Sequence, residues 1–75
     1  MYTIYSKPNC SYCLQAKQLL EMEQLPFEYK NLGTHYSLDE LMTLSPDAKS
    51  FPQVFKDGVL IGGYSELVEH LKQQY

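Results

Sequence analysis

The chain has 75 residues, 44% of them hydrophobic and 20% charged, which suits one small globular domain spanning residues 1–75 rather than a disordered segment. Its formal net charge is -3 and all six basic residues are lysines, so it lacks the arginines that recognise phosphates and base edges, and nucleic acid is not an expected partner. No window approaches the roughly 20 apolar residues that cross a bilayer, and the first residues lack the pattern of a secretory signal, so we expect a cytoplasmic protein without membrane association.

The first 32 residues predict a strand, a helix and a second strand. Residues 2–5, YTIY, are aromatic and β-branched and predict the first strand. From Ser11 to Gln24 apolar side chains recur near helical spacing, which predicts a helix that ends before Pro26. Residues 27–32, FEYKNL, alternate in the period-two pattern of a half-exposed strand. Two strands joined by a helix predict a right-handed parallel βαβ unit.

A second helix is predicted over residues 37–44. Ser37 and Glu40 stand at the spacing of a capping box, in which each side chain binds a backbone N–H of the first turn. We expect Met22 of the first helix and Met42 of this one to fill gaps in the core.

The last part of the chain predicts a hairpin and a third helix. Strands are predicted at residues 53–56 and 59–61, and the Asp57-Gly58 pair between them is a strong hairpin signal. After Ser65, a good N-cap residue, apolar positions recur at helical spacing and predict a helix that runs to the C-terminus. The predicted order is therefore βαβαββα.

The two cysteines of the chain lie three residues apart in SKPNCSYCLQAK, residues 6–17, where the first strand meets the first helix. A zinc site needs four ligands, and the other good candidates, His35 and His70, are too far apart for a zinc finger, so we expect both to face solvent. A structural disulfide would close a very short loop, and such bonds are rare in reducing compartments. A working redox pair is the interpretation we favour, because a helix start suits an exposed thiolate with a second thiol in reach.

The position of each cysteine predicts its role. Cys10 would lie at the start of the helix, where unpaired N–H groups and the helix dipole favour negative charge, and Lys7 adds a nearby cation. We therefore predict that the Cys10 thiolate is the nucleophile. Cys13 would lie one turn into the helix and be more buried, so we predict that it resolves the mixed disulfide.

Four motifs follow one another along the chain: Lys7 three residues before the first cysteine, CSYC at residues 10–13, SFP at residues 50–52 and GGYSEL at residues 62–67. Together they resemble the glutaredoxin family, a branch of the thioredoxin superfamily, over essentially the whole length. The resemblance implies an α/β thioredoxin fold with a four-stranded mixed sheet in the order 2-1-3-4 and helices on both faces. It also implies a cis proline at the end of SFP.

The resemblance implies glutathione as co-substrate, with no tightly bound cofactor and no metal. A cation would pair with its glycine carboxylate, backbone groups beside the cis proline would pair with its cysteine, and the start of the last helix would hold its γ-glutamyl carboxylate and amine. Gly62 would make room for this backbone approach. The residues implied in glutathione binding are Lys7, Tyr12, Phe51, Pro52, Gly63, Tyr64, Ser65 and Glu66.

The implied activity is glutathione-dependent thiol–disulfide exchange by a monomer, with disulfide-containing or glutathionylated proteins as partners and ribonucleotide reductase as a candidate among them. Two alternatives stay open. One is a thioredoxin-like electron donor to ribonucleotide reductase that a flavoprotein reductase reduces. The other is a module that holds a [2Fe–2S] cluster between two monomers, because Ser11 stands where the commonest glutaredoxins have proline and some relatives with serine there bind such a cluster.

Overall fold

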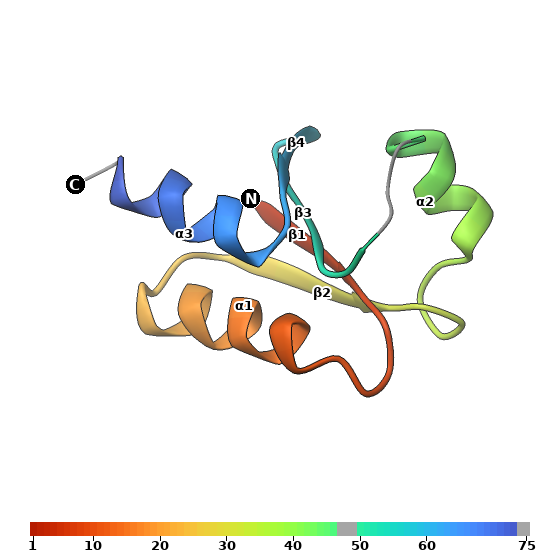
Figure 1. Cartoon of the computed structure of the whole chain (residues 1–75), viewed down its shortest axis with the longest axis horizontal. Helices are drawn as coiled ribbons and strands as arrows, with labels where there is room; N and C mark the ends of the chain where they lie inside the picture. Colours follow the sequence, from red (N-terminus) through yellow and green to blue (C-terminus); the bar gives the residue numbers. More distant parts are fainter. Residues whose placement is uncertain (47–49, 74–75) are drawn as a thin grey trace.

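The computed structural model describes residues 1–46 and 50–73, which form strands and helices in the order βαβαββα (Figure 1). In chain order they are β1 (Tyr2–Ser6), α1 (Ser11–Met22), β2 (Phe27–Asn31), α2 (Leu38–Leu44), β3 (Gln53–Lys56), β4 (Val59–Gly62) and α3 (Tyr64–Lys72). The predicted elements are all present, and most of their bounds agree with the prediction to within about two residues. The predicted end of the last helix at the C-terminus falls outside the described residues.

The strands form one mixed sheet in the order β2-β1-β3-β4, as predicted. β1 and β2 run parallel, with α1 as the crossover between them, and β3 is antiparallel to β1 and to β4. The start of β3 lies beside the end of β1, where Tyr5 pairs with Gln53, and the end of β4 lies beside β3, where Gly62 pairs with Val54. This topology gathers the start of α1, the loop before β3 and the start of α3 at one region of the molecule.

Side chains from opposite faces of the sheet form two apolar clusters. Between the sheet and the pair α1 and α3 lie Tyr2, Ile4, Ala16, Leu20, Val54, Leu67 and Leu71. On the other face, beneath α2, lie Tyr5, Tyr36, Leu41 and Phe55. Figure 1 shows α2 well apart from α1 and α3, so helices cover both faces of the sheet. Each fully buried large aliphatic side chain contributes roughly 1.5–3 kcal/mol through burial alone.

Three expectations about single side chains are wrong. The buried stripe of α1 is Cys13, Ala16 and Leu20, and Met22 lies two residues beyond it, so it projects from another side of the helix and is 79% exposed. Met42 is exposed for the same reason, because Leu41 occupies the buried side of α2. His70 is half-buried, with its ring edge-on to Tyr2 at 6.0 Å between centroids.

Tyr36 ties the segment before α2 to the end of β1. Its buried hydroxyl donates a hydrogen bond of 2.7 Å to the carbonyl of Ser6, which also accepts one of 2.9 Å from the N–H of Leu32. Burial, with a smaller contribution from Tyr5, raises the pKa of Tyr36 to about 12. Because Ser6 comes directly before Lys7, this bond also supports the loop that leads to the cysteines.

Replacing Tyr36 with phenylalanine should lower the free energy of unfolding by about 0.5–1.5 kcal/mol, the net value of one hydrogen bond, since the carbonyl of Ser6 keeps its other donor. The folded-state pKa lies above the unfolded value near 10, so the contribution of the buried phenol is complete below about pH 10 and is lost as the pH rises to about 12. Urea unfolding at neutral and alkaline pH checks both points. Tyr12→Phe is the control, because Tyr12 is 57% exposed. A phenylalanine variant with unchanged stability and the same alkaline decline would contradict the role of this hydroxyl.

Candidate active site

Cys10 and Cys13 form a disulfide at the start of α1, with their Cα atoms 5.3 Å apart. Cys10 is the N-cap residue and has extended backbone angles, whereas Cys13 is the third residue of the helix. The structure therefore holds the oxidised state of the predicted redox pair. The i, i+3 spacing brings the two side chains together across the first turn.

The two cysteines differ in exposure and in hydrogen bonding. Cys13 is completely buried, whereas Cys10 is partly exposed. The Sγ atom of Cys10 accepts a hydrogen bond of 3.2 Å from the backbone N–H of Cys13. In the reduced protein this donor and the helix dipole would stabilise a thiolate on Cys10. The asymmetry supports Cys10 as the attacking sulfur and Cys13 as the one that resolves.

The loop before Cys10 depends on features that the sequence-based prediction missed. Asn9 has a φ of 58°, in the left-handed region that asparagine tolerates better than most residues. Ser6 is fully buried, and its hydroxyl lies 2.8 Å from the carbonyl of Lys30 and 2.8 Å from the side chain oxygen of Asn31. The one available signal was the identity of Asn9, since nothing in the sequence pairs Ser6 with residues 24 and 25 positions away.

A groove of about 320 Å³ lies between the loop before β3 and the start of α3, and Tyr12 of the Cys10–Cys13 motif lines it. The peptide bond between Phe51 and Pro52 is cis, as the resemblance implied. The lining residues are Tyr12, Ser50, Phe51, Pro52, Gly63, Tyr64, Ser65 and Glu66. The structure thus brings together seven of the eight residues predicted to bind glutathione and adds Ser50.

Two tyrosines stand together over this groove. Tyr12, between the two cysteines, is 57% exposed, and Tyr64 is the first residue of α3. Their ring centroids are 5.8 Å apart and the ring planes are tilted by 32°. The pair joins the start of α1 to the start of α3, so a ligand in the groove would meet an aromatic wall.

The start of α3 is organised by Glu66 rather than by Ser65. Gly63, not Ser65 as predicted, is the N-cap residue, because its backbone is extended and the helix begins at Tyr64. One carboxylate oxygen of Glu66 accepts from the N–H of Gly63 at 2.7 Å, and the other accepts from the hydroxyl of Ser65 at 2.8 Å. These two bonds lower the pKa of Glu66, and the bond from the Ser65 hydroxyl contributes more than the one from the Gly63 N–H. The carboxylate therefore remains charged at the first turn of α3, whose residues line the groove.

Gly62 is required by its conformation and by the side chain of Glu66. Its φ is 132°, a region that other residues rarely adopt. A Cβ atom at this position would lie 2.7 Å from both Cβ and Cγ of Glu66, which is too close. Gly63 has a φ of -89°, and a Cβ atom there would lie 3.2 Å from Oε1 of Glu66 and 3.5 Å from the carbonyl oxygen of Pro52. Gly62 is therefore required for its backbone conformation and for space, whereas Gly63 has an ordinary φ and a longer distance to its nearest neighbour.

Lys7 is the one predicted glutathione residue that does not line the groove. It is exposed and lines an adjoining hollow together with Cys10. Its Nζ atom lies 5.6 Å from the ring centroid of Phe51, which does line the groove. The lysine is therefore placed at the rim, within reach of the groove across the Phe51 ring.

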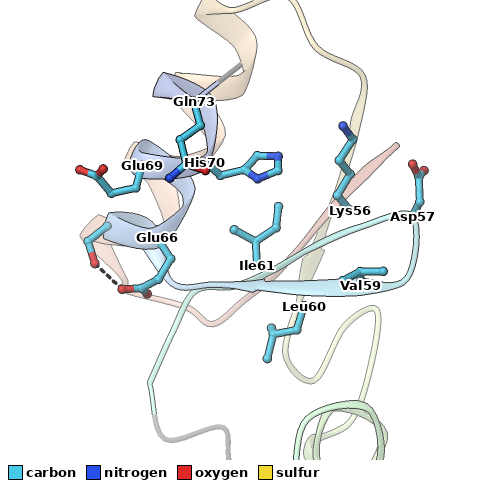
Figure 2. A pocket seen from close by; sticks show the side chains of 10 residues that line it. Lys56, Asp57, Val59, Leu60, Ile61, Glu66, Glu69, His70 and Gln73 are labelled. Atoms are coloured by element: carbon cyan, nitrogen blue, oxygen red, sulfur yellow. Dashed lines mark hydrogen bonds between the residues drawn. The ribbon is translucent and has the colours of Figure 1, made fainter. Parts of the chain in front are cut away.

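A larger hollow of about 810 Å³ lies between β4 and α3, away from the cysteines. Figure 2 shows Glu66, Glu69 and His70 of α3, with Gln73 just after the helix, on one side and Lys56 and Asp57 of the hairpin on the other. Ser65 and Glu66 line both this hollow and the groove. The hydrogen bond between them is dashed in Figure 2. No residue of the Cys10–Cys13 motif lines it, whereas Tyr12 of that motif lines the groove, so this hollow is not the candidate active site.

Residues 1–46 and 50–73 lack two kinds of feature. No helix in this part of the chain has both the length and the apolar character needed to cross a bilayer. The same residues contain no group of three or more histidine, cysteine, aspartate or glutamate side chains arranged to hold a metal ion.

Comparison with known proteins identifies the family. The glutaredoxin family model matches residues 2–61. Glutaredoxin of Enterobacteria phage T4 is 38% identical over 87 residues, covering 96% of this chain and 100% of the phage protein. Hybrid peroxiredoxin hyPrx5 of Haemophilus influenzae is 37% identical over 68 residues, which are 91% of this chain but only 28% of that relative. The structure of reduced Escherichia coli glutaredoxin has the same fold, with a TM-score of 0.82 and 24% identity over 96% of this chain and 93% of that one. The chain therefore belongs to the glutaredoxin family.

Proposed function

We propose that the protein is a glutathione-dependent thiol–disulfide oxidoreductase that reduces glutathionylated proteins and protein disulfides. The observation that supports this most directly is the groove at Tyr12 of the Cys10–Cys13 motif, where a cis proline, two tyrosines and the start of α3 come together. Glutathione carries two carboxylates and one amine. The helix start offers N–H donors for a carboxylate, and Glu66 offers an acceptor for an amine.

In the proposed cycle, the thiolate of Cys10 attacks the glutathione sulfur of a glutathionylated protein. A disulfide forms between Cys10 and glutathione, and the protein sulfur leaves as a thiolate that takes up a proton. A second glutathione thiolate then attacks the bound glutathione sulfur, which restores the Cys10 thiolate and releases glutathione disulfide. One free glutathione is consumed for each glutathionylated protein, and the products are the protein thiol and glutathione disulfide.

Protein disulfides would follow a route through both cysteines. Cys10 attacks one sulfur of the substrate and releases the other as a thiolate, and the thiolate of Cys13 then attacks Cys10. This step releases the second substrate thiol and leaves the Cys10–Cys13 disulfide, the state that the structure contains. Two glutathione molecules reduce it again. A reducing compartment such as the cytoplasm would supply the glutathione, and ribonucleotide reductase is one candidate for the protein substrate.

We place glutathione along the groove with its γ-glutamyl carboxylate at the N–H groups of Tyr64 and Ser65 and its amine near Glu66. Its cysteine would pair with the backbone of Phe51, as an added strand does. Its glycine carboxylate would lie toward Lys7, at the rim beyond the Phe51 ring. The ligand's two ends would then be held by different parts of the chain.

One assay separates this proposal from its alternatives. Purified protein should turn over a small mixed disulfide of glutathione when glutathione and glutathione reductase supply electrons, and it should not do so with thioredoxin reductase. Activity with thioredoxin reductase alone would establish the thioredoxin-like donor instead. A visible absorption band in the protein as purified would point to the iron–sulfur alternative.

Removing the two side chains at the ends of the proposed glutathione site should weaken catalysis in separate steps. Lys7→Ala should lower kcat/KM for glutathione by about fivefold, because an exposed ion pair contributes about 1 kcal/mol or less. Glu66→Ala should lower it by about five- to tenfold, and the double variant by about the product of the two. Steady-state kinetics with varied glutathione measures all three.

Glu66→Gln is the control for this series. Its amide oxygen can still accept from the N–H of Gly63, so it keeps the start of α3 while removing the charge. If the loss in Glu66→Ala comes from the carboxylate's interaction with the amine, Glu66→Gln should lose nearly as much activity. Unchanged glutathione dependence in the double variant would show that the site has been placed wrongly.

A further inference from the structure

A second hollow of about 460 Å³ lies beside Cys10 and shares no residue with the groove. Its lining residues are Lys7, Pro8, Asn9, Cys10, Ser11, Leu14, Tyr29 and Asn31. Ser11 lines this hollow and the next residue, Tyr12, lines the groove, so the start of α1 separates the two spaces. We call it the Leu14 hollow. The attacking cysteine therefore borders a space that the proposed glutathione site meets only at Lys7.

The walls of the Leu14 hollow are partly apolar. Leu14 lies one helical turn after Cys10 and is 53% exposed, which is high for a leucine next to a reactive group. Pro8 and the half-buried ring of Tyr29 add further apolar surface. An exposed leucine on its own needs no explanation, but here it borders the reacting sulfur together with two other apolar side chains.

The charges at this hollow are positive. Lys7 lines it, and Nζ of Lys17 lies 5.2 Å from the ring centroid of Tyr29, so a second ammonium group stands over one of its walls. Among the described residues no carboxylate lines it, whereas the groove on the other side contains Glu66. The next carboxylate along this side of α1, Glu21, follows Lys17 by four residues and is one turn further from Cys10.

We propose that the Leu14 hollow receives the segment of a protein substrate that flanks its reacting cysteine, and that it favours segments carrying apolar and acidic side chains. This inference rests on the proposed function and deepens it. Glutathione is a tripeptide and needs only the groove and Lys7 at its rim, whereas a protein substrate extends on both sides of its disulfide. When its sulfur reaches Cys10, its chain must cover the surface on the other side, where Leu14 offers apolar contact and Lys7 and Lys17 attract carboxylates.

Two glutathionylated peptides of equal length test the proposal. In one the cysteine is flanked by leucine and glutamate, and in the other by leucine and lysine. The wild-type protein should release glutathione from the acidic peptide with a kcat/KM about tenfold higher than from the basic one at low ionic strength, since two exposed charge contacts of up to about 1 kcal/mol each are at work. The preference should shrink as salt is added, because these contacts are exposed.

Three variants assign the preference to this surface. Lys17→Glu should remove or reverse it, and Leu14→Gln should lower kcat/KM for both peptides several-fold. Lys72→Glu, which makes the same charge change at an exposed position of α3 outside this hollow, should keep the wild-type preference. None of the three should alter turnover of the small mixed disulfide of glutathione. If Lys17→Glu does not fold, Lys17→Ala serves in its place. The logarithm of its kcat/KM ratio between the acidic and the basic peptide should be about half that of the wild type.

The outcomes distinguish failure of the proposed function from failure of this inference. No glutathione-dependent turnover of the small disulfide would overturn the proposed function itself. Normal turnover of the small disulfide with equal rates for the two peptides would overturn this inference alone. A preference that survives in Lys17→Glu and disappears in Lys72→Glu would also overturn it, because the selecting charge would then lie elsewhere.

Discussion

Cys10→Ser should abolish every exchange reaction of the protein, whereas Cys13→Ser should keep the release of glutathione from glutathionylated substrates. The reason is the asymmetry of the site. Cys10 is the accessible sulfur at the N-cap, and Cys13 is fully buried behind it. Release of glutathione needs only the nucleophile and a second glutathione, while reduction of a protein disulfide needs the resolving thiol as well. Cys13→Ser should therefore lose most of its activity toward protein disulfides.

Two assays on the same preparations measure this difference, one with a glutathionylated peptide and one with a protein disulfide such as that of insulin. Ser11→Ala is a suitable control, because it changes the same helical turn without removing a thiol. Equal loss of glutathione release in both cysteine variants would mean that the roles are misassigned or that the route through one thiol does not operate. Melting temperatures of the reduced proteins show whether a loss of activity reflects loss of the fold.

The sequence predicted the fold well because each of its elements has a local signal. The alternation in residues 27–32, the capping box of Ser37 and Glu40 and the turn at Asp57-Gly58 depend on neighbours only a few positions apart. The structure contains the predicted strand, the capping box and the turn. Side chain burial was harder to predict. Periodicity shows that α1 has a buried stripe, but whether Met22 belongs to it depends on where the sheet lies.

The candidate site was predicted by resemblance more than by local chemistry. Motifs far apart in sequence specify residues that meet only in the folded chain, and seven of the eight predicted glutathione residues do line one groove. The details set by tertiary contacts were not predictable. The position of Lys7 depends on the Phe51 ring, over which its ammonium group lies. The Leu14 hollow is formed by residues far apart in sequence, because Tyr29 of β2 lines it together with the start of α1. Whether these residues bind glutathione stays a prediction.

Gly62→Ala should both destabilise the protein and weaken its use of glutathione. A non-glycine residue held at a φ of 132° costs roughly 1–3 kcal/mol. The added Cβ atom would also lie 2.7 Å from Cβ and Cγ of Glu66, atoms near the helix backbone that cannot swing aside as a side-chain tip can. For a domain of this size we expect the melting temperature to fall by roughly 5–20 °C.

The catalytic loss should follow from the displacement of Glu66. Its carboxylate holds the N–H of Gly63 and the hydroxyl of Ser65, so moving it disturbs the start of α3 where the γ-glutamyl end of glutathione is proposed to bind. We expect kcat/KM for glutathione to fall by at least as much as in Glu66→Ala, about tenfold, in protein that is still folded at the assay temperature. Gly63→Ala is the matched control for stability. Its φ is -89°, and the nearest atom is the flexible tip of Glu66 at 3.2 Å, so its melting temperature should stay close to that of the wild type. If the two alanine variants melted alike and Gly62→Ala used glutathione normally, the close approach of Glu66 to Gly62 would not be what builds this end of the groove.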